Sequence, residues 1–183
     1  MLKVPARPTP SELQAARGRS IPDVIAPGLD VLFVGINPSL WSGAVGLHFA
    51  RPGNRFWRAL HEAGFTDRLL SPQEGRVLLK SRVGVTNLVN RATASADELD
   101  LADYERGGRR VEAKIRRYRP RVVAFVGMGA YRAAFSRPRA RGGRQEDRLA
   151  GAEIWVLPNP SGRTAGYQMP ALARAFRELR RSL

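Results

Sequence analysis

Short apolar runs alternate along the chain with longer segments in which apolar residues recur every three or four positions. Nearly continuous apolar runs are typical of strands buried on both faces of a sheet. We expect strands at residues 31–36, 83–89, 121–126 and 152–157. Apolar residues spaced three or four positions apart predict helices at residues 53–64, 99–118, 129–135 and 169–183. This alternation predicts an α/β fold, a three-layer α/β/α sandwich with a mainly parallel central sheet.

The segments between these elements are interpreted from their turn chemistry. Ser71, Pro72 and Glu74 predict the start of a helix, because serine caps, proline suits the first turn and glutamate completes a capping box. Residues 39–52 are rich in glycine and residues 137–150 are rich in arginine, so both segments are expected to be loops.

The first residues of the chain differ in character from the rest. Residues 1–24 combine prolines and arginines with little periodicity, which predicts a poorly ordered basic arm with a short helix near residues 11–17. At 183 residues the chain is long enough for one domain with a buried core. We place that single domain at residues 25–183.

The chain is strongly basic, with a formal net charge of +15 from 31 lysines and arginines against 16 aspartates and glutamates. Lysine occurs only at Lys3, Lys80 and Lys114, so nearly all of the positive charge is arginine. The planar guanidinium group binds phosphate through two parallel hydrogen bonds. We therefore expect a polyanionic partner such as nucleic acid. The alternative is that all proteins of the organism are rich in arginine, which would produce the same composition without such a partner.

Several function classes are excluded by composition. The absence of cysteine excludes disulfides, iron–sulfur clusters, cysteine-ligated zinc and thiol nucleophiles. His48 and His61 are the only histidines, which is too few to predict a histidine metal site. No apolar run is long enough to cross a bilayer, and the N-terminus has no signal-peptide core. We expect a soluble intracellular protein that does not associate with membranes.

Two of the apolar runs end in sharp turns that carry polar side chains. Residues 31–36 lead directly into Asn37, and residues 152–157 lead into Asn159 and Ser161. Ligands of open α/β sheets bind at the carboxyl ends of the strands, so these two elbows predict two lips of one cleft. A turn residue that caps its own backbone is the structural alternative for Asn37.

Six motifs occur in the same order as in a known enzyme family. They are Gly-Ile-Asn-Pro at 35–38, Phe-Ala-Arg-Pro-Gly-Asn-Arg-Phe-Trp at 49–57, Ala-Gly-Phe-Thr at 63–66, Gly-Val-Thr-Asn-Leu-Val at 84–89, Gly-Gly-Arg at 107–109 and Asn-Pro-Ser-Gly at 159–162. Over residues 25–179 the sequence resembles the mismatch-specific uracil-DNA and thymine-DNA glycosylases, which form family 2 of the uracil-DNA glycosylase superfamily. The first motif alone is weak, but the ordered set is specific. The resemblance implies a uracil-DNA glycosylase-like fold.

The resemblance also implies roles in a base-binding pocket. Asn37 is expected to hold the attacking water beneath the anomeric carbon of a flipped nucleotide. A carboxamide is a very weak base and neither elbow motif contains a carboxylate, so we expect a dissociative reaction in which uracil leaves as an anion. Backbone N–H groups near Ile36 and Phe49 are implied to stabilise that anion. Phe49 is also the expected stacking wall, with Ser42 and Asn87 beside it; core packing of Phe49 and a structural Asn87 are the alternatives.

The second elbow is implied to enter the duplex and fill the space left by the flipped nucleotide. Its expected DNA-binding residues are Asn159, Ser161, Gly162, Arg163 and Thr164. Arg163 departs from the branch of the family that carries a leucine wedge, which favours looser selectivity for the opposing base and activity on single strands. Phosphate contacts are expected from Arg51, Arg55 and Arg91.

Together these features predict a monofunctional DNA glycosylase of base excision repair. It would hydrolyse the N-glycosidic bond of uracil, and of related damaged or mispaired pyrimidines, without a metal or a cofactor. No lysine is placed as a Schiff-base nucleophile, so the expected product is an abasic site in an unbroken strand. We expect a monomer in a bacterial cytoplasm, at the nucleoid, acting on double-stranded DNA with uracil or mismatches and also on single-stranded DNA.

Two alternatives remain open at this point. One is a non-catalytic binder of mismatched or abasic DNA, which would keep the fold and the basic surface. The other is a nucleotide hydrolase that uses the same α/β cleft. The lack of a Walker phosphate loop and of a metal-binding carboxylate cluster disfavours the second alternative.

Overall fold

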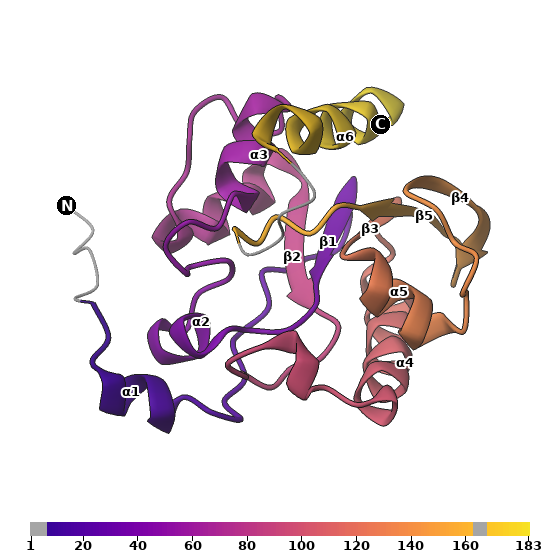
Figure 1. Ribbon diagram of the computed structural model, residues 1–183. Coiled ribbons are helices and arrows are strands. Elements are labelled where there is room, and N and C mark those ends of the chain that lie inside the picture. The colour runs from indigo at the N-terminus through magenta and orange to yellow at the C-terminus, as the bar shows by residue number, and fades with distance from the viewer. Residues whose placement is uncertain (1–6, 163–167) are drawn as a thin grey trace.

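A five-stranded sheet forms the centre of the computed structural model, which describes residues 7–162 and 168–183 (Figure 1). The strands are β1 (Val31–Gly35), β2 (Val83–Asn87), β3 (Val122–Val126), β4 (Gly143–Leu149) and β5 (Ala152–Leu157). Their order in the sheet is β2-β1-β3-β5-β4. All neighbouring pairs are parallel except β4 and β5, which are antiparallel. The mainly parallel sheet predicted from the apolar runs is confirmed.

Helices cover both faces of this sheet (Figure 1). The α-helices are α1 (Pro10–Ala15), α2 (Leu40–Val45), α3 (Phe56–Glu62), α4 (Leu101–Tyr118), α5 (Met128–Phe135) and α6 (Met169–Ser182). The 3-10 helices are η1 (Pro72–Ser81) and η2 (Ala96–Glu98). α3 and α6 pack with η1 in the core on one face, whereas α4 and α5 form the core on the other. The predicted three-layer sandwich is therefore confirmed.

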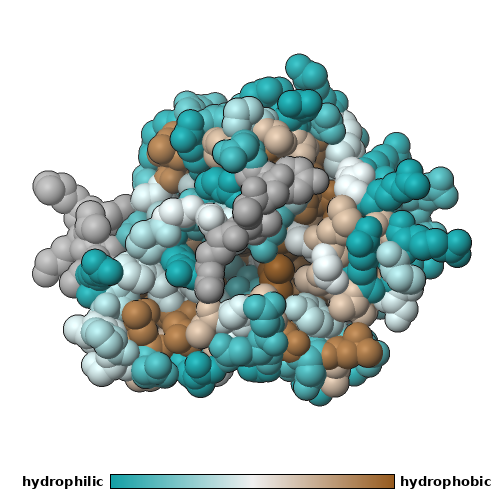
Figure 2. All heavy atoms as spheres, viewed as in Figure 1, coloured by the Kyte–Doolittle hydropathy of each residue, from teal (hydrophilic) through white to brown (hydrophobic). Residues whose placement is uncertain are grey.

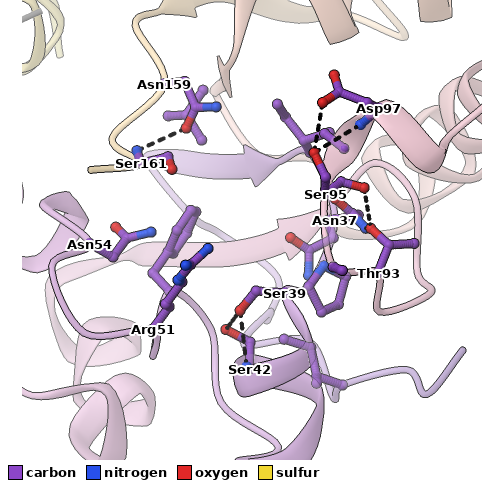
Figure 3. A pocket seen from close by; sticks show the side chains of 18 residues that line it. Asn37, Ser39, Ser42, Arg51, Asn54, Thr93, Ser95, Asp97, Asn159 and Ser161 are labelled. Atoms are coloured by element: carbon purple, nitrogen blue, oxygen red, sulfur yellow. Dashed lines mark hydrogen bonds between the residues drawn. The ribbon is translucent and has the colours of Figure 1, made fainter. Parts of the chain in front are cut away.

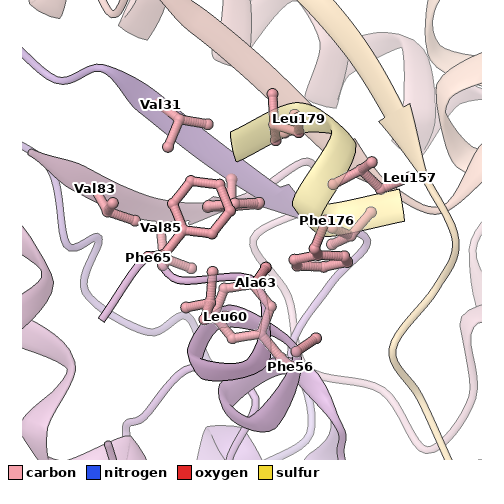
Figure 4. Packing of buried hydrophobic residues seen from close by; sticks show 14 of the residues in the cluster. Val31, Phe56, Leu60, Ala63, Phe65, Val83, Val85, Leu157, Phe176 and Leu179 are labelled. Carbon is pink, nitrogen blue, oxygen red and sulfur yellow. The ribbon is translucent and has the colours of Figure 1, made fainter. Parts of the chain in front are cut away.

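Alternate residues of β1 belong to the two cores. Val31 and Phe33 pack with α3 and α6, and Leu32 and Val34 pack with α4 and α5. Phe33 makes an edge-on contact with the ring of Phe56 at a centroid distance of 5.5 Å. Figure 4 shows Phe56 with Val31 and Phe176 in this core. A strand that is buried on both faces needs apolar side chains at every position, which explains the unbroken apolar run.

A pair of glycines lies where α4 comes closest to its neighbours. A β-carbon at Gly107 would lie 2.5 Å from the carbonyl oxygen of Leu88, just after β2. One at Gly108 would lie 2.9 Å from the carbonyl oxygen of Ala134 in α5. Glycine disfavours a helix interior by its propensity, and here the close approach of backbones requires it.

Helix starts follow the capping signals in the sequence. Ser71 and Glu74 form the predicted capping box, although the element that they begin is the 3-10 helix η1. Ser39 caps α2 by accepting a hydrogen bond from the N–H of Ser42 at 3.1 Å, so the loop predicted over residues 39–52 is wrong in its first half. The buried residues of α2 are small. The helix therefore lacks the large apolar stripe that reveals a helix in a sequence.

The loop predicted over residues 137–150 is also wrong in its second half, which forms β4. Backbone hydrogen bonds to β5 do not require apolar side chains, and charged side chains on an edge strand discourage pairing with other chains. Arg144 and Arg148 each form an ion pair with Glu153 of β5 at 3.1 Å. Figure 2 shows hydrophilic side chains gathered over this edge of the molecule.

The poorly ordered arm expected at the N-terminus is wrong for residues 7–24. α1 begins with a capping box, and Ile21 is buried. Val24 forms an antiparallel bridge with Val85 of β2. A few apolar side chains and backbone bonds hold this segment against the domain, although it has no periodic pattern. Residues 1–6 of the predicted arm lie outside the described residues.

Candidate active site

A cavity of about 400 Å³ opens at the carboxyl edge of the sheet. Residues at or just beyond the ends of β1, β2, β3 and β5 line it, together with residues 93–97 and the segment that follows α2 (Figure 3). The site residues predicted from the sequence that line it are Ile36, Asn37, Ser42, Phe49, Arg51, Asn87, Asn159 and Ser161. The two elbows therefore contribute to one cavity, because the ends of parallel strands meet at the same edge.

Asn37 is held in one orientation by the loop that faces it. Its amide nitrogen donates to the carbonyl oxygen of Arg91 at 3.0 Å and to Oγ1 of Thr93 at 2.7 Å. A carbonyl only accepts, and the Thr93 hydroxyl donates its own proton to the carbonyl oxygen of Ser95, so the NH₂ group must face both partners. No described residue donates a hydrogen bond to Oδ1 of Asn37. The amide oxygen is thus able to orient a water, and the side chain does not cap its own turn.

Arg91 supports this arrangement through its main chain and its side chain. Its guanidinium group forms an ion pair with Asp103 at 2.5 Å and donates to the carbonyl oxygen of Glu98 at 3.1 Å. The hydrogen bond from Arg91 lowers the pKa of Asp103 to about 2. Arg91 does not line the cavity, and its contact with a DNA phosphate stays a prediction.

Phe49 forms one wall of the cavity and is fixed from behind. Its ring stacks on the ring of Phe56, with centroids 3.9 Å apart and planes 19° apart. A β-carbon at Gly35 would lie 3.1 Å from the Phe49 ring, so glycine at the end of β1 lets the ring come this close. Ser42 fixes the same loop by accepting a hydrogen bond from the N–H of Ala50 at 3.2 Å. Phe49 therefore packs on the core with one face and also lines the cavity.

Asn87, the last residue of β2, is oriented by a buried histidine. His48 Nε2 lies 2.9 Å from the carbonyl oxygen of Pro22, so this nitrogen carries the proton of the neutral ring. Nδ1 is then an acceptor and faces the amide nitrogen of Asn87 at 3.5 Å. The amide oxygen of Asn87 lies toward Gly35, where a β-carbon would be 2.6 Å from it. Asn87 thus offers a hydrogen-bond acceptor beside the wall formed by Phe49.

The histidine behind Asn87 makes stability depend on pH. Burial lowers the pKa of His48, although its hydrogen bond to Pro22 and the charge of Asp23 oppose this. The unfolded chain therefore binds a proton on this ring at higher pH than the native protein does, and the free energy of unfolding falls as the pH drops below about 6.5. We expect the urea midpoint to decrease between about pH 7.5 and about pH 5.5, and to decrease less in His48→Gln. Equal pH dependence in both proteins would contradict this role of His48.

The second elbow is tied to the segment that precedes α3. Arg55 donates from its guanidinium group to the carbonyl oxygen of Ser161 at 2.8 Å and from its main-chain N–H to that of Pro160 at 3.0 Å. Oδ1 of Asn159 accepts a hydrogen bond from the N–H of Ser161 at 2.9 Å. A β-carbon at Gly162 would lie 2.8 Å from a carbonyl oxygen of the facing segment. The DNA contacts of these residues stay predictions. Outside the described residues lie two further predicted contacts, Arg163 and Thr164.

The cavity also contains a carboxylate that neither elbow motif supplies. Asp97 of η2 is exposed at the cavity wall, and Ser95 Oγ donates to its carboxylate at 2.8 Å. Among the described lining residues it is the one acidic side chain. Asp97 follows no strand end, so the strand pattern that indicated Asn37 and Asn159 did not indicate this residue. Its signal in the sequence is a serine followed by acidic residues, which is typical of a capped helical turn.

The chemistry available at this cavity, among the described residues, comes from amides, hydroxyl groups, one carboxylate, an aromatic ring and the guanidinium group of Arg51. Within residues 7–162 and 168–183, no cluster of three or more histidine, aspartate or glutamate side chains could hold a metal ion. Over the same described ranges, no helix is long and apolar enough to cross a membrane.

The fold and the cavity define a class of α/β protein in which two strand-to-loop elbows enclose a polar pocket with a fixed asparagine. A family model described as the uracil DNA glycosylase superfamily matches residues 22–182, and the chain belongs to this superfamily. The solution structure of a candidate uracil DNA glycosylase from Methanosarcina acetivorans is similar, with a TM-score of 0.54 and 20% sequence identity over 89% of this chain and 98% of that chain. At this identity the likeness shows a shared fold. Membership of the superfamily supports DNA glycosylase activity in general, with DNA as the partner.

Proposed function

We propose that the protein is a mismatch-specific uracil-DNA glycosylase of base excision repair, which hydrolyses the N-glycosidic bond of uracil and of related damaged or mispaired pyrimidines. The observation that carries the proposal is Asn37, which lines the cavity with its amide nitrogen fixed by the facing loop and its oxygen accepting no hydrogen bond from the described residues. A stacked base cannot reach such a pocket, so the target nucleotide must flip out of the duplex. A mispaired uracil costs less to extrude than a paired base, which favours mismatches as substrates.

The reaction expected at Asn37 is dissociative. Its amide oxygen can accept a hydrogen bond from water but cannot remove a proton at neutral pH. The glycosidic bond therefore breaks first, and uracil leaves as an anion. Water then adds to the cationic sugar, and the proton that it loses passes to the uracil anion or to solvent. The N–H groups of Ile36 and Phe49 support this order, because both residues line the cavity and neither amide donates to an acceptor among the described residues. Each such donor is typically worth about 3 kcal/mol when it faces a developing negative charge.

Phe49 and Asn87 suit the recognition of a pyrimidine that has a proton on N3. Stacking of the base on Phe49 would contribute about 1–3 kcal/mol. The amide oxygen of Asn87 can accept the N3–H of uracil or thymine, whereas neutral cytosine has no proton at N3. His48 supports this selection because it binds the amide nitrogen and leaves the oxygen to face the base.

The product is proposed to be an abasic site in an intact strand. No lysine lines the cavity in the described part of the chain, so no amine is available there to form a Schiff base with the sugar. The basic surface supplies phosphate contacts, with Arg51 at the cavity itself. We propose a monomer that acts in the cytoplasm, at the nucleoid, on double-stranded and single-stranded DNA.

Asp97→Asn tests whether a positive sugar forms in the transition state. A carboxylate at the cavity stabilises that charge, so we expect kcat to fall about 10- to 100-fold while the Kd for DNA stays the same or decreases. Asp67→Asn is the matched control, because Asp67 is exposed and does not line the cavity. An unchanged kcat in Asp97→Asn would contradict the charge stabilisation. A loss beyond about 10³-fold would identify Asp97 as a general base and overturn the dissociative reaction.

A panel of oligonucleotides tests the function as a whole. The strands differ only in the lesion and in the opposing base, and alkali cleaves them wherever the protein has left an abasic site. We expect cleavage at uracil opposite guanine after alkali and no cleavage before it. Normal binding with no abasic product from any member of the panel would overturn the proposal in favour of a non-catalytic binder of mismatched DNA.

A further inference from the structure

A second cavity, of about 440 Å³, lies beside the first. The two cavities adjoin, because Ser39, Arg51 and Ala94 line both of them. The outer part of the second cavity is formed by the N-terminal segment and by α2, which contribute Arg7 and Trp41. The excision reaction described above uses no residue that is confined to this second cavity.

The side chains of the second cavity suit one unpaired nucleotide. Trp41 is half-buried, and the guanidinium carbon of Arg7 lies 6.0 Å from the centre of its ring. Arg51 lies where the two cavities meet. No acidic side chain is among the described residues that line the second cavity. An aromatic ring beside guanidinium groups is the combination by which proteins bind unpaired bases and their phosphates.

The N-terminal segment and α2, which form the outer wall of the second cavity, are fixed to the rest of the domain. A β-carbon at Gly43 of α2 would lie 2.7 Å from the β-carbon of Ala92 and 3.3 Å from the carbonyl oxygen of Ala16, so glycine allows the end of α1 to pack here. Ala16 is fully buried. Arg17 forms an ion pair with Glu98, which ties the same segment to the loop that holds Asn37. The second cavity is therefore a preformed surface next to the reactive pocket.

We propose that the second cavity is a subsite for the unpaired nucleotide next to the flipped one on the same DNA strand. The base of that nucleotide stacks on Trp41, and its phosphates bind Arg7 and Arg51. The inference rests on the proposed function, because the flipped nucleotide must occupy the first cavity. It favours uracil in single-stranded or locally opened DNA, where the neighbouring base is not held in a duplex.

Tryptophan fluorescence tests the subsite without catalysis. Of the three tryptophans, Trp57 and Trp155 are 6% and 7% exposed, so quenching by DNA reports on Trp41. We expect quenching by single-stranded DNA that contains 2′-fluoro-2′-deoxyuridine, in which fluorine destabilises the cationic sugar and blocks cleavage. Trp41→Leu should remove the quenching and raise Kd roughly tenfold. Arg7→Ala should weaken binding several-fold more than Arg110→Ala, a matched loss of charge on α4 outside both cavities.

Uracil excision provides the second readout. We compare two single-stranded oligonucleotides, one with uracil at its 5′ end and one with uracil at its 3′ end. In each of them the uracil has a neighbouring nucleotide on one side only. For the oligonucleotide whose neighbouring nucleotide enters the subsite, Trp41→Leu should raise KM roughly tenfold and leave kcat nearly unchanged. For the other oligonucleotide, both KM and kcat should stay close to the wild-type values. Trp41→Phe, which keeps an aromatic ring, should restore most of the affinity.

Two results would overturn the subsite. One is equal DNA affinity in Trp41→Leu and Arg110→Ala when both variants have the wild-type melting temperature. The other is tryptophan emission that DNA leaves unchanged. A different result separates the two proposals: if wild-type protein is quenched by single-stranded DNA but releases no uracil, the glycosylase proposal fails and the subsite is retained as a single-strand binding site.

Discussion

Replacing Asn37 with alanine is expected to lower kcat for uracil excision by about 10²–10³-fold and to leave the Kd for uracil-containing DNA within about twofold. The oxygen of Asn37 accepts no hydrogen bond from the described residues, so in the free protein it is available to a water. Alanine removes the group that positions this nucleophile, but it removes no charge from the DNA-binding surface. Each tenfold loss in rate corresponds to about 1.4 kcal/mol of transition-state free energy.

Single-turnover excision and DNA binding by fluorescence anisotropy separate the two effects. Gln73→Ala is a suitable control, because it removes a carboxamide in η1 that lines neither cavity. Its excision rate should equal that of the wild type. An Asn37→Ala variant with undiminished single-turnover rate would show that another group positions the water, and parallel losses of rate and affinity would show that Asn37 acts in binding instead.

Replacing Gly107 with alanine is expected to lower the free energy of unfolding by about 1–3 kcal/mol. The added β-carbon would lie 2.5 Å from the carbonyl oxygen and 2.9 Å from the carbonyl carbon of Leu88. Both are backbone atoms, so no side-chain rotation can relieve the contact. The N–H of Leu88 donates to the carbonyl oxygen of Gly35 at 2.8 Å, so a displacement here reaches the end of β1 beside the cavity. Urea unfolding measures the loss.

Gly129→Ala is the matched control for this substitution. Gly129 lies in α5, has no heavy atom of another segment within 4 Å of an added β-carbon, and does not have a left-handed backbone. Alanine there should leave stability unchanged or raise it by up to about 1 kcal/mol, because it restricts the unfolded chain. If Gly107→Ala were as stable as Gly129→Ala, the close packing of α4 against the end of β2 would not be the reason for the glycine.

The strands of the parallel sheet could be predicted because each is buried on both faces. β5 has the predicted limits of residues 152–157, and β1 ends at Gly35, one residue before the predicted end. The same pattern located Asn37 and Asn159 just beyond strand ends. Since parallel strands present their carboxyl ends at one edge, the alternation of strands and helices was enough to predict that these two residues share a cavity.

Elements without an apolar pattern could not be predicted in this way. β4 is charged on most of its surface, and it is a strand because β5 offers it unpaired backbone groups at the sheet edge. The segment over residues 7–24 is held by isolated side chains such as Ile21 and by a bridge to Val85, and neither produces a periodic signal. Asp97 reaches the cavity only through the path of the loop between β2 and α4.

By itself, the sequence determined the layers of this protein, the two elbows and the residue types available for chemistry, since burial and turn formation depend on local patterns of apolar, glycine and proline residues. The tertiary structure alone decided how those residues are used. Asn37 acquires its orientation from Arg91 and Thr93, which are more than fifty positions away in the chain. Such contacts depend on how the crossover connections place distant loops over one edge of the sheet, and no local pattern encodes that placement.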